Sequence, residues 1–332
     1  MIRITLVFPP IKCKLMQDRI KLFLQSVLTL RNYMHEKYGL KAYLAWITIC
    51  IVWGTTYLVI RIGVSDLPPM LFAGIRWIIA GVLMTILLNL RHYKLPALKD
   101  LKHLAVVGIL LLGVGNGLVV VAEQWLPSGL TALILSTQPF WIVGMEYFLP
   151  NRPKINLFIL TGLLLGTAGV IIIFARDLNI AFDFNIVIGG ICLLGAVIAW
   201  SVGSLYWKYI KSDVRPLMGA SIQMLIAGVL QTTLGLILGE QNGFHLTQNG
   251  VFALGYLIVF GSILGYASYI YTVTKLPLSL VSTYAYINPI IAILLGWYIL
   301  DEPLTITVFI ASGLILIGVA LVKRGNTLAL RK

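Results

Sequence analysis

The stretch LPLSLVSTYAYINPIIAILLGWYILDE, residues 276–302, decides the fold of this chain. It is long and apolar enough for a membrane-spanning helix, but it has a proline near its middle, Pro289. Another proline, Pro303, follows the stretch directly. The same pattern occurs 150 residues earlier in LPSGLTALILSTQPFWIVGMEYFLPNRP, residues 126–153, where Pro139 takes the place of Pro289. An apolar helix that recurs with a proline at the same place indicates a duplicated membrane bundle.

The composition also indicates a membrane protein. Of the 332 residues, 59% are hydrophobic and only 11% are charged, whereas soluble domains carry about 25% charged residues. Apolar runs of about 20 residues, each long enough to cross a bilayer core of about 30 Å, recur along the chain. We expect ten spans, at residues 43–62, 70–90, 102–122, 127–148, 156–175, 187–208, 216–238, 250–273, 279–299 and 304–323.

The net charge of +13 arises almost wholly from basic residues in loops and tails. It therefore predicts orientation in a membrane, not nucleic-acid binding. If the N-terminus is cytoplasmic, every Lys and Arg lies in a cytoplasmic loop or tail except Arg61 and Arg176, in outer loops, and Arg76, inside a span. The expected protein is a multi-pass protein of the cell membrane (inner or plasma membrane) with both termini in the cytoplasm.

The first two spans repeat as well, at a shift of 147 residues. Trp53 matches Trp200, Pro69 matches Pro216, and the sequence AGVL occurs at 80–83 and again at 227–230. Five helices thus repeat as five helices, and an odd number makes the two halves enter the membrane from opposite sides. The predicted fold is an all-α membrane protein with ten transmembrane helices arranged as two inverted five-helix repeats, which is typical of secondary transporters.

This pattern predicts four segments. They are a basic N-terminal tail at 1–42, a first repeat at 43–175 (helices 1–5), a second repeat at 187–323 (helices 6–10) and a basic C-terminal tail at 324–332. Two interpretations of residues 1–42 stay open. The segment either forms a basic interfacial helix near Asp18–Asn32, or it precedes a true translation start at Met34, so that residues 1–33 are not translated.

Several short motifs carry a family resemblance. They are VWGTTY at 52–57, AGIRW at 73–77, Asn288-Pro289, Gly296 and DEPLT at 301–305. With these motifs the chain resembles the EamA family of the drug/metabolite transporter superfamily over residues 43–323. The resemblance implies ten helices, two EamA repeats and movement of small metabolites, often outward. One departure is Arg152, where the first repeat of the family often has Glu, so that Glu302 has no matched carboxylate in the first half.

Charges within or near the spans are the first candidates for function, because a charge in lipid needs a cavity or a partner. Arg76 lies about 9 Å inside helix 2 at 1.5 Å per residue. It either extends outward to the headgroups or holds a carboxylate, with Glu123 as its more plausible protein neighbour. Glu123 and Glu146 are the proton-coupling candidates, and neither is expected to be deeply buried.

Polar and aromatic side chains form stripes at helical spacing in helices 1, 6, 8 and 9, and such stripes should face inward. The alternative is that Ser and Thr bond to their own helix and that the amides join helices. The substrate-binding candidates are Trp53, Thr56, Arg76, Asn116, Gln138, Trp200, Ser204, Gln223, Tyr266, Tyr269, Ser282, Tyr286 and Asn288. Pro139 and Pro289 each free a carbonyl one turn earlier, at Leu135 and Ala285, and are either hinges or static kinks.

The chain lacks the motifs of an enzyme. It has no HExxH, GxSxG or phosphate-binding P-loop motif. The three cysteines have no paired spacing, so neither a disulfide framework nor a metal site is expected. No cofactor is implied, and ATP hydrolysis is excluded.

The sequence therefore predicts a secondary transporter that exports small polar metabolites, such as amino acids, by alternating access. Aromatic faces suit an apolar side chain or an ammonium group, and Arg76 suits a carboxylate. The alternatives are an exporter of toxic amphipathic compounds, a non-transporting membrane scaffold or an intramembrane enzyme. The expected partners are a small-molecule substrate and the lipid bilayer, with no nucleic acid, for a chain that is a monomer or homodimer.

Overall fold

The computed structural model describes residues 39–146, 148, 156–175, 184–210, 212–276 and 278–329. Most of the expected N-terminal tail, Arg152 and the last three residues of the C-terminal tail lie outside this part of the chain. The chain divides into two units, Met1–Leu44 and Ala45–Lys332. Of the first unit, the structure describes residues 39–44, which form the start of one helix.

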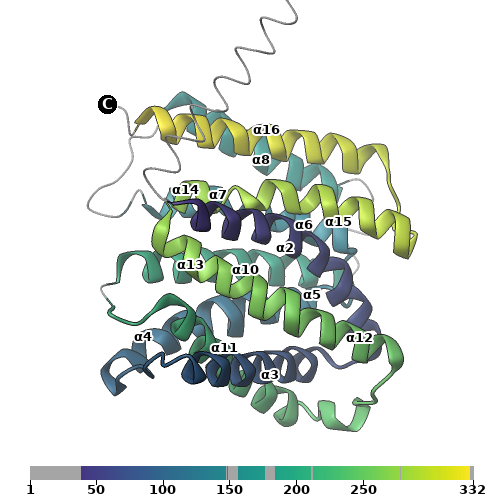
Figure 1. Ribbon diagram of the computed structural model, residues 1–332. Helices are drawn as coiled ribbons and strands as arrows, with labels where there is room; N and C mark the ends of the chain where they lie inside the picture. The colour runs from purple at the N-terminus through teal and green to yellow at the C-terminus, as the bar shows by residue number, and fades with distance from the viewer. Residues whose placement is uncertain are drawn as a thin grey trace, which may run out of the picture. The chain divides into compact units, whose positions relative to one another are not determined.

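All the elements in these residues are helical (Figure 1). The first half contains α2 (Leu40–Asp66), α3 (Pro69–Leu90), α4 (Leu98–Gly108), the π-helix η1 (Ile109–Asn116), α5 (Gly117–Ala122), α6 (Ser128–Leu135), α7 (Gln138–Glu146) and α8 (Leu157–Ala175). The second half contains α10 (Phe184–Tyr209), α11 (Pro216–Ile237), the short η2 (Glu240–Gly243), α12 (Gln248–Tyr256), the π-helix η3 (Leu257–Tyr266), α13 (Ala267–Lys275), α14 (Leu278–Val281), α15 (Tyr284–Leu300) and α16 (Ile306–Ala329).

The expected all-α membrane fold is confirmed. Within the described ranges, six helices are long and apolar enough to cross a membrane, namely Leu40–Asp66, Pro69–Leu90, Leu98–Ala122, Phe184–Tyr209, Pro216–Ile237 and Gln248–Lys275. The other four expected spans are occupied by α6–α7, α8, α14–α15 and α16. Large apolar side chains such as Leu87 and Leu90 are exposed on the protein, as side chains that face lipid must be.

Helices 4 and 9 of the prediction are each divided in two. The first break lies at Ser136–Thr137, where both hydroxyls donate to carbonyls one turn earlier. Pro139 follows as the second residue of α7, a position where a missing N–H costs little. The second break lies at Ser282–Thr283, one helical turn before residues 286–287, which match the first break at a shift of 150. Pro289 lies inside the continuous helix α15. The two prolines therefore occupy different local structures.

Helices 3 and 8 each contain a wide π turn. The segment η1 ends at Asn116, and η3 ends at Tyr266, which is the matched residue at a shift of 150. Segments of π-helix occur frequently at functional sites because they shift side chains relative to the regular helix. Both turns therefore mark the middle of these two helices as candidate site walls.

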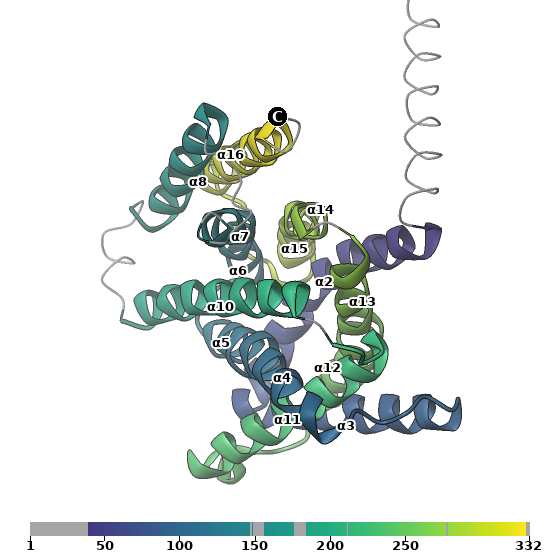
Figure 2. The same ribbon diagram turned by 90° about the vertical axis from the view of Figure 1, so that its left-hand side faces the viewer.

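Contacts between helices follow the repeat. The helix α3 packs along α11, and α8 packs along α16, in both views of the fold (Figures 1 and 2). A Cβ on Gly81 would lie 2.8 Å from the Leu225 side chain, and a Cβ on Gly228 would lie 2.7 Å from the backbone of Ile78. A shift of 147 residues converts Gly81 into Gly228 and Ile78 into Leu225. The two repeats therefore make the same close helix contact, once from each side.

A second contact is repeated at the helix ends. Arg61 donates to the backbone carbonyl of Glu123, and its matched residue Lys208 donates to that of Val273 at 2.8 Å. Val273 is itself the match of Glu123 at a shift of 150. Basic side chains thus bind the final carbonyls of helices 3 and 8, where the helix dipole favours a cation. The sequence repeat is therefore also a two-fold repeat of contacts.

Gly228→Ala should destabilise the fold, because the new methyl would press on the α3 backbone. Overpacking of this kind costs about 1–3 kcal/mol. Gly255→Ala is the matched control, since a Cβ there meets nothing within 4 Å. We expect thermal unfolding in detergent to show a lower melting temperature for Gly228→Ala and an equal or higher one for Gly255→Ala. Equal melting temperatures for the two variants would contradict the close α3–α11 contact.

Candidate functional site

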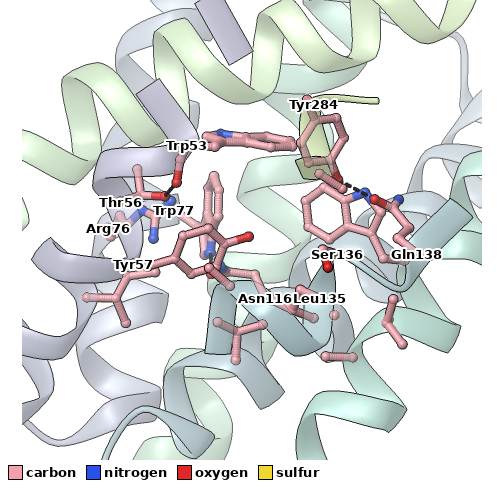
Figure 3. A pocket seen from close by; sticks show the side chains of 18 residues that line it. Trp53, Thr56, Tyr57, Arg76, Trp77, Asn116, Leu135, Ser136, Gln138 and Tyr284 are labelled. Carbon is pink, nitrogen blue, oxygen red and sulfur yellow. Dashed lines mark hydrogen bonds between the residues drawn. The ribbon is translucent and has the colours of Figure 1, made fainter. Parts of the chain in front are cut away.

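A cavity of about 70 Å³ lies between the two repeats (Figure 3). Two matched pairs line it, Trp53 with Trp200 and Leu135 with Ala285. The remaining lining residues are Thr56, Tyr57, Ile60, Arg76, Trp77, Gly115, Asn116, Val119, Ala132, Ser136, Gln138, Ala196, Val197 and Tyr284. We call this space the central cavity.

Aromatic rings form part of the cavity wall. The rings of Trp53 and Trp200 meet edge to face, with centroids 5.3 Å apart. Tyr284 meets Trp53 in the same way at 5.1 Å. Two matched glycines make room for the indoles, because a Cβ on Gly265 would lie 2.5 Å from Trp53 and one on Gly115 would lie 3.1 Å from Trp200. The π turns thus seat the two tryptophans at equivalent places.

Arg76 supplies the charge of this site. Its side chain is only 3% exposed, so it does not extend to the protein surface as one of the two expectations had it. Nε donates to the Ser262 hydroxyl at 2.8 Å, and the guanidinium lies 4.2 Å from the Trp77 ring centroid. Nη1 has no hydrogen-bond partner within the described part of the chain. A buried cation with an unused donor at a cavity is able to bind an anionic group.

The side-chain amides of Asn116 and Gln138 are each oriented by a hydrogen bond that the amide oxygen accepts. The Trp77 indole N–H donates to Asn116 Oδ1 at 3.1 Å, and the Tyr284 hydroxyl donates to Gln138 Oε1 at 2.6 Å (Figure 3). Each amide therefore keeps its NH₂ group for another acceptor, and Nε2 of Gln138 is buried without one in these residues. Arg76, Asn116 and Gln138 thus present N–H donors from three different helices.

Hydroxyl groups supply acceptors to the same cavity. Thr56 donates to the Trp53 carbonyl at 2.9 Å, and Ser136 donates to the Leu133 carbonyl at 2.6 Å. Since a hydroxyl that donates once still has lone pairs, these oxygens are able to accept from a bound molecule. The central cavity therefore combines donors, acceptors and ring faces, which suits a small molecule with both an anionic and a cationic group.

Glu123 is more deeply buried than the sequence predicted. It follows the last residue of α5 and is fully buried, with both carboxylate oxygens unpaired in the described residues. Burial raises the pKa of its carboxyl well above the usual range, nearby Glu302 adds to the rise, and Arg61 and Arg76 oppose it. The carboxyl is therefore neutral over a wider pH range than an exposed glutamate. A position at a helix end indicated exposure, but the neighbouring helices cover it.

The other carboxylate, Glu146, lies at the end of α7. It accepts a hydrogen bond from the Tyr209 hydroxyl at 3.3 Å and is partly exposed, as expected. It does not line the central cavity. In the residues searched, no group of three or more His, Cys, Asp or Glu side chains is arranged to hold a metal ion.

The structure brings some of the predicted site residues together and separates others. Those that line the central cavity are Trp53, Thr56, Arg76, Asn116, Gln138 and Trp200. Behind this wall, the Ser204 hydroxyl bonds to the Tyr269 hydroxyl at 2.6 Å, and the Tyr266 hydroxyl donates to Gln223 at 2.7 Å. Ser282 and Asn288 are buried without lining the cavity, and Tyr286 packs against a separate apolar cluster around Leu133 and Phe140.

The sequence prediction missed several lining residues, chiefly Tyr57, Trp77, Ser136 and Tyr284. For two of them, the sequence contained a feature that could have identified them. Tyr57 lies in the polar stripe of helix 1, and Trp77 directly follows Arg76. Ser136 and Tyr284 had none, because their positions depend on the breaks in helices 4 and 9, which an unbroken helical pattern does not predict.

Comparison with known proteins places the chain in a family. The profile of the EamA-like transporter family matches residues 40–175 and 187–324. The chain belongs to this family. It is thus a multi-pass membrane transporter, and the match to the family confirms the resemblance seen in the sequence motifs.

Relatives of this EamA-like transporter cover nearly its whole length. It is 37% identical to the uncharacterized inner membrane transporter YedA of Escherichia coli (strain K12), over 86% of this chain and 91% of that protein. It is 26% identical to the uncharacterized transporter YoaV of Bacillus subtilis (strain 168), over 84% and 95%. A solved crystal structure with 21% identity covers 87% of this chain and 98% of its own, with a TM-score of 0.65, which supports the fold.

Leu135→Cys should react with a small thiol reagent faster than Leu133→Cys. Leu135 lines the central cavity, whereas Leu133, two residues away on α6, is fully buried in an apolar cluster. The measurement is the modification rate of each purified variant after the native cysteines are replaced by alanine. Equal rates, or faster labelling of Leu133→Cys, would show that the cavity is assigned to the wrong face of α6.

Proposed function

We propose that this EamA-like protein is a secondary transporter that exports small polar metabolites, such as amino acids, by alternating access. The observation that carries the substrate class is the buried Arg76, whose Nη1 is unpaired at a cavity between the two repeats. A cation in this position is costly in a membrane unless an anion compensates it. A carboxylate on the transported molecule would be such an anion.

The chemistry of the cavity favours an amino acid over a simple anion. The carboxylate would bind Arg76 and the NH₂ group of Asn116, which both offer donors. An ammonium group would meet the faces of Trp53 and Trp200 and the hydroxyl oxygens of Thr56 and Ser136. The apolar lining at Ile60 and Val119 would accommodate an aliphatic or aromatic side chain.

Alternating access at this site requires the two halves to move apart in turn, so that the cavity opens to each side of the membrane. The breaks in helices 4 and 9 support such motion, since they divide helices that line the cavity. Pro139 and Pro289 stay candidate hinges in this proposal, although only Pro139 lies beside a break. Glu123 is the proposed proton carrier, because it is fully buried and interacts electrostatically with Arg76.

Arg76→Gln should weaken specific amino-acid binding most, because it removes both the charge and the two-pronged donor. Arg76→Lys should impair it, since the charge stays but the paired geometry is lost. The loss for Arg76→Gln should be about tenfold to a hundredfold in affinity, as expected for hydrogen bonds to a charged group. The measurement is equilibrium binding of a labelled amino-acid panel to purified protein.

The matched control is Arg215→Gln, which makes the same chemical change outside the cavity, where Arg215 stacks over Tyr93. It should bind like the wild type. If Arg76→Gln binds as tightly as Arg215→Gln, Arg76 does not hold the substrate.

We also propose that both termini are cytoplasmic. Ser65→Cys, in an exposed position at the end of α2, should then react with an impermeant thiol reagent added to intact cells. Lys94→Cys, exposed in the next connection, should react only after the cells are permeabilised. The opposite pattern would reverse the orientation.

A further inference from the structure

Glu302 joins the two repeats at one end of the helix 4–helix 9 pair. Its carboxylate accepts hydrogen bonds from the backbone N–H and the hydroxyl of Ser128, at 2.8 and 2.9 Å, and from the backbone N–H of Gly129 at 3.2 Å. These are the first residues of α6, so a carboxylate at the end of helix 9 occupies the N-terminus of helix 4. Bonds to a charged acceptor at a helix N-terminus are stronger than those between neutral groups.

The local sequence explains how Glu302 reaches this place. Asp301 ends α15 in the left-handed region at φ 52°, which Asp tolerates better than most residues. The Glu302 N–H then donates back to the Gly296 carbonyl at 3.1 Å, and Pro303 prevents the helix from continuing. Gly296 leaves space for the carboxylate, because a Cβ there would overlap Glu302 and lie 2.8 Å from the Ser128 hydroxyl.

This contact packs α6 tightly against α15. A Cβ on Gly129 would lie 2.9 Å from the Ile293 side chain, and Ser128 is fully buried. Farther along α6, Ala132 and Leu135 line the central cavity. The Glu302 contact therefore holds the first turn of a helix whose later residues line the cavity.

None of the residues in this contact is repeated in the other half. At a shift of 150, Ser128 matches Leu278, Gly296 matches Glu146 and Glu302 matches Arg152. Glu146 instead accepts from Tyr209 of α10. The contacts of Arg61 and Lys208 are two-fold related within the described residues. The residues of the Glu302 contact differ between the halves in sequence, and Arg152 itself lies outside the described residues.

We propose that Glu302 is a latch residue that holds the transporter closed on one side of the membrane, whereas the matched position in the other half is Arg152. The proposal rests on the proposed transport function, in which the cavity opens to each side in turn. Release of Ser128 and Gly129 would free the start of α6. Because α6 ends at the Ser136–Thr137 break, this short helix is able to swing away from α15 as a unit.

The test measures the α6–α15 distance directly, without a substrate. Spin labels are placed at Leu130, a half-buried residue of α6, and at Tyr298, an exposed residue of α15, in a variant whose native cysteines are alanine. The parent should give mainly one distance. Glu302→Gln keeps the shape but removes the charge, and it should raise the population at longer distances about tenfold.

Glu240→Gln is the matched control, because Glu240 also accepts from two amides at a helix N-terminus, Met70 and Leu71 of α3, but away from helices 4 and 9. It should leave the distance unchanged. Ser128→Ala provides a milder second variant that removes only the hydroxyl bonds, and it should shift the distance in the same direction as Glu302→Gln.

An unchanged distance in both Glu302→Gln and Ser128→Ala would overturn the latch, as would an equal shift in Glu240→Gln. If Glu302→Gln does not yield folded protein, Ser128→Ala against Glu240→Gln decides alone. Failure of the latch leaves the binding tests at Arg76 untouched. Conversely, absence of amino-acid binding would not alter the measured distances.

Discussion

A charged side chain inside a membrane span must find its partners within the protein, since lipid offers none. Arg76 meets this constraint through Ser262 and the Trp77 ring, and Nη1 has no partner in the part of the chain that the structure describes, so a donor is left at the central cavity. The surrounding site is arranged around that charge. Trp77 also orients the Asn116 amide, and helix 8 reaches Arg76 through Ser262, within a π turn. Among the described residues, the cavity thus derives its polarity from one cation and from neutral groups, without a carboxylate in its lining.

The duplication provides a symmetric frame, and function requires departures from it. Matched contacts at Gly81 and Gly228, and at Arg61 and Lys208, hold equivalent helices together. The charge of Arg76 has no equivalent, because its matched residue is Gln223, which bonds to Tyr266. An inverted pair of identical halves would bind a substrate equally on both sides. Differences at a few matched positions give the two ends of the transport path different chemistry.

The helices, the repeat and the inward-facing stripes were predictable, because apolar length, proline spacing and helical periodicity are local signals. A stripe identifies the inner face of a helix, but it does not distinguish a cavity wall from a packed core. Tyr286 and Trp200 illustrate this, since both lie in predicted stripes and only Trp200 lines the cavity. The helix breaks, the π turns and the burial of Glu123 depend on neighbouring helices and so have no local signal. The lack of a match for Glu302 pointed away from a symmetric role, and nothing in the sequence indicated its hydrogen bond from Ser128.

The central claim is that the cavity moves a molecule with a carboxylate. Counterflow in proteoliposomes tests it most directly, with a panel of labelled amino acids compared with the corresponding amino-acid amides, which keep the ammonium group and side chain. The account predicts saturable exchange of at least one amino acid and little or no exchange of its amide, with and without a pH gradient. Equal exchange of an acid and its amide, or exchange of cationic amphiphiles alone, would contradict it.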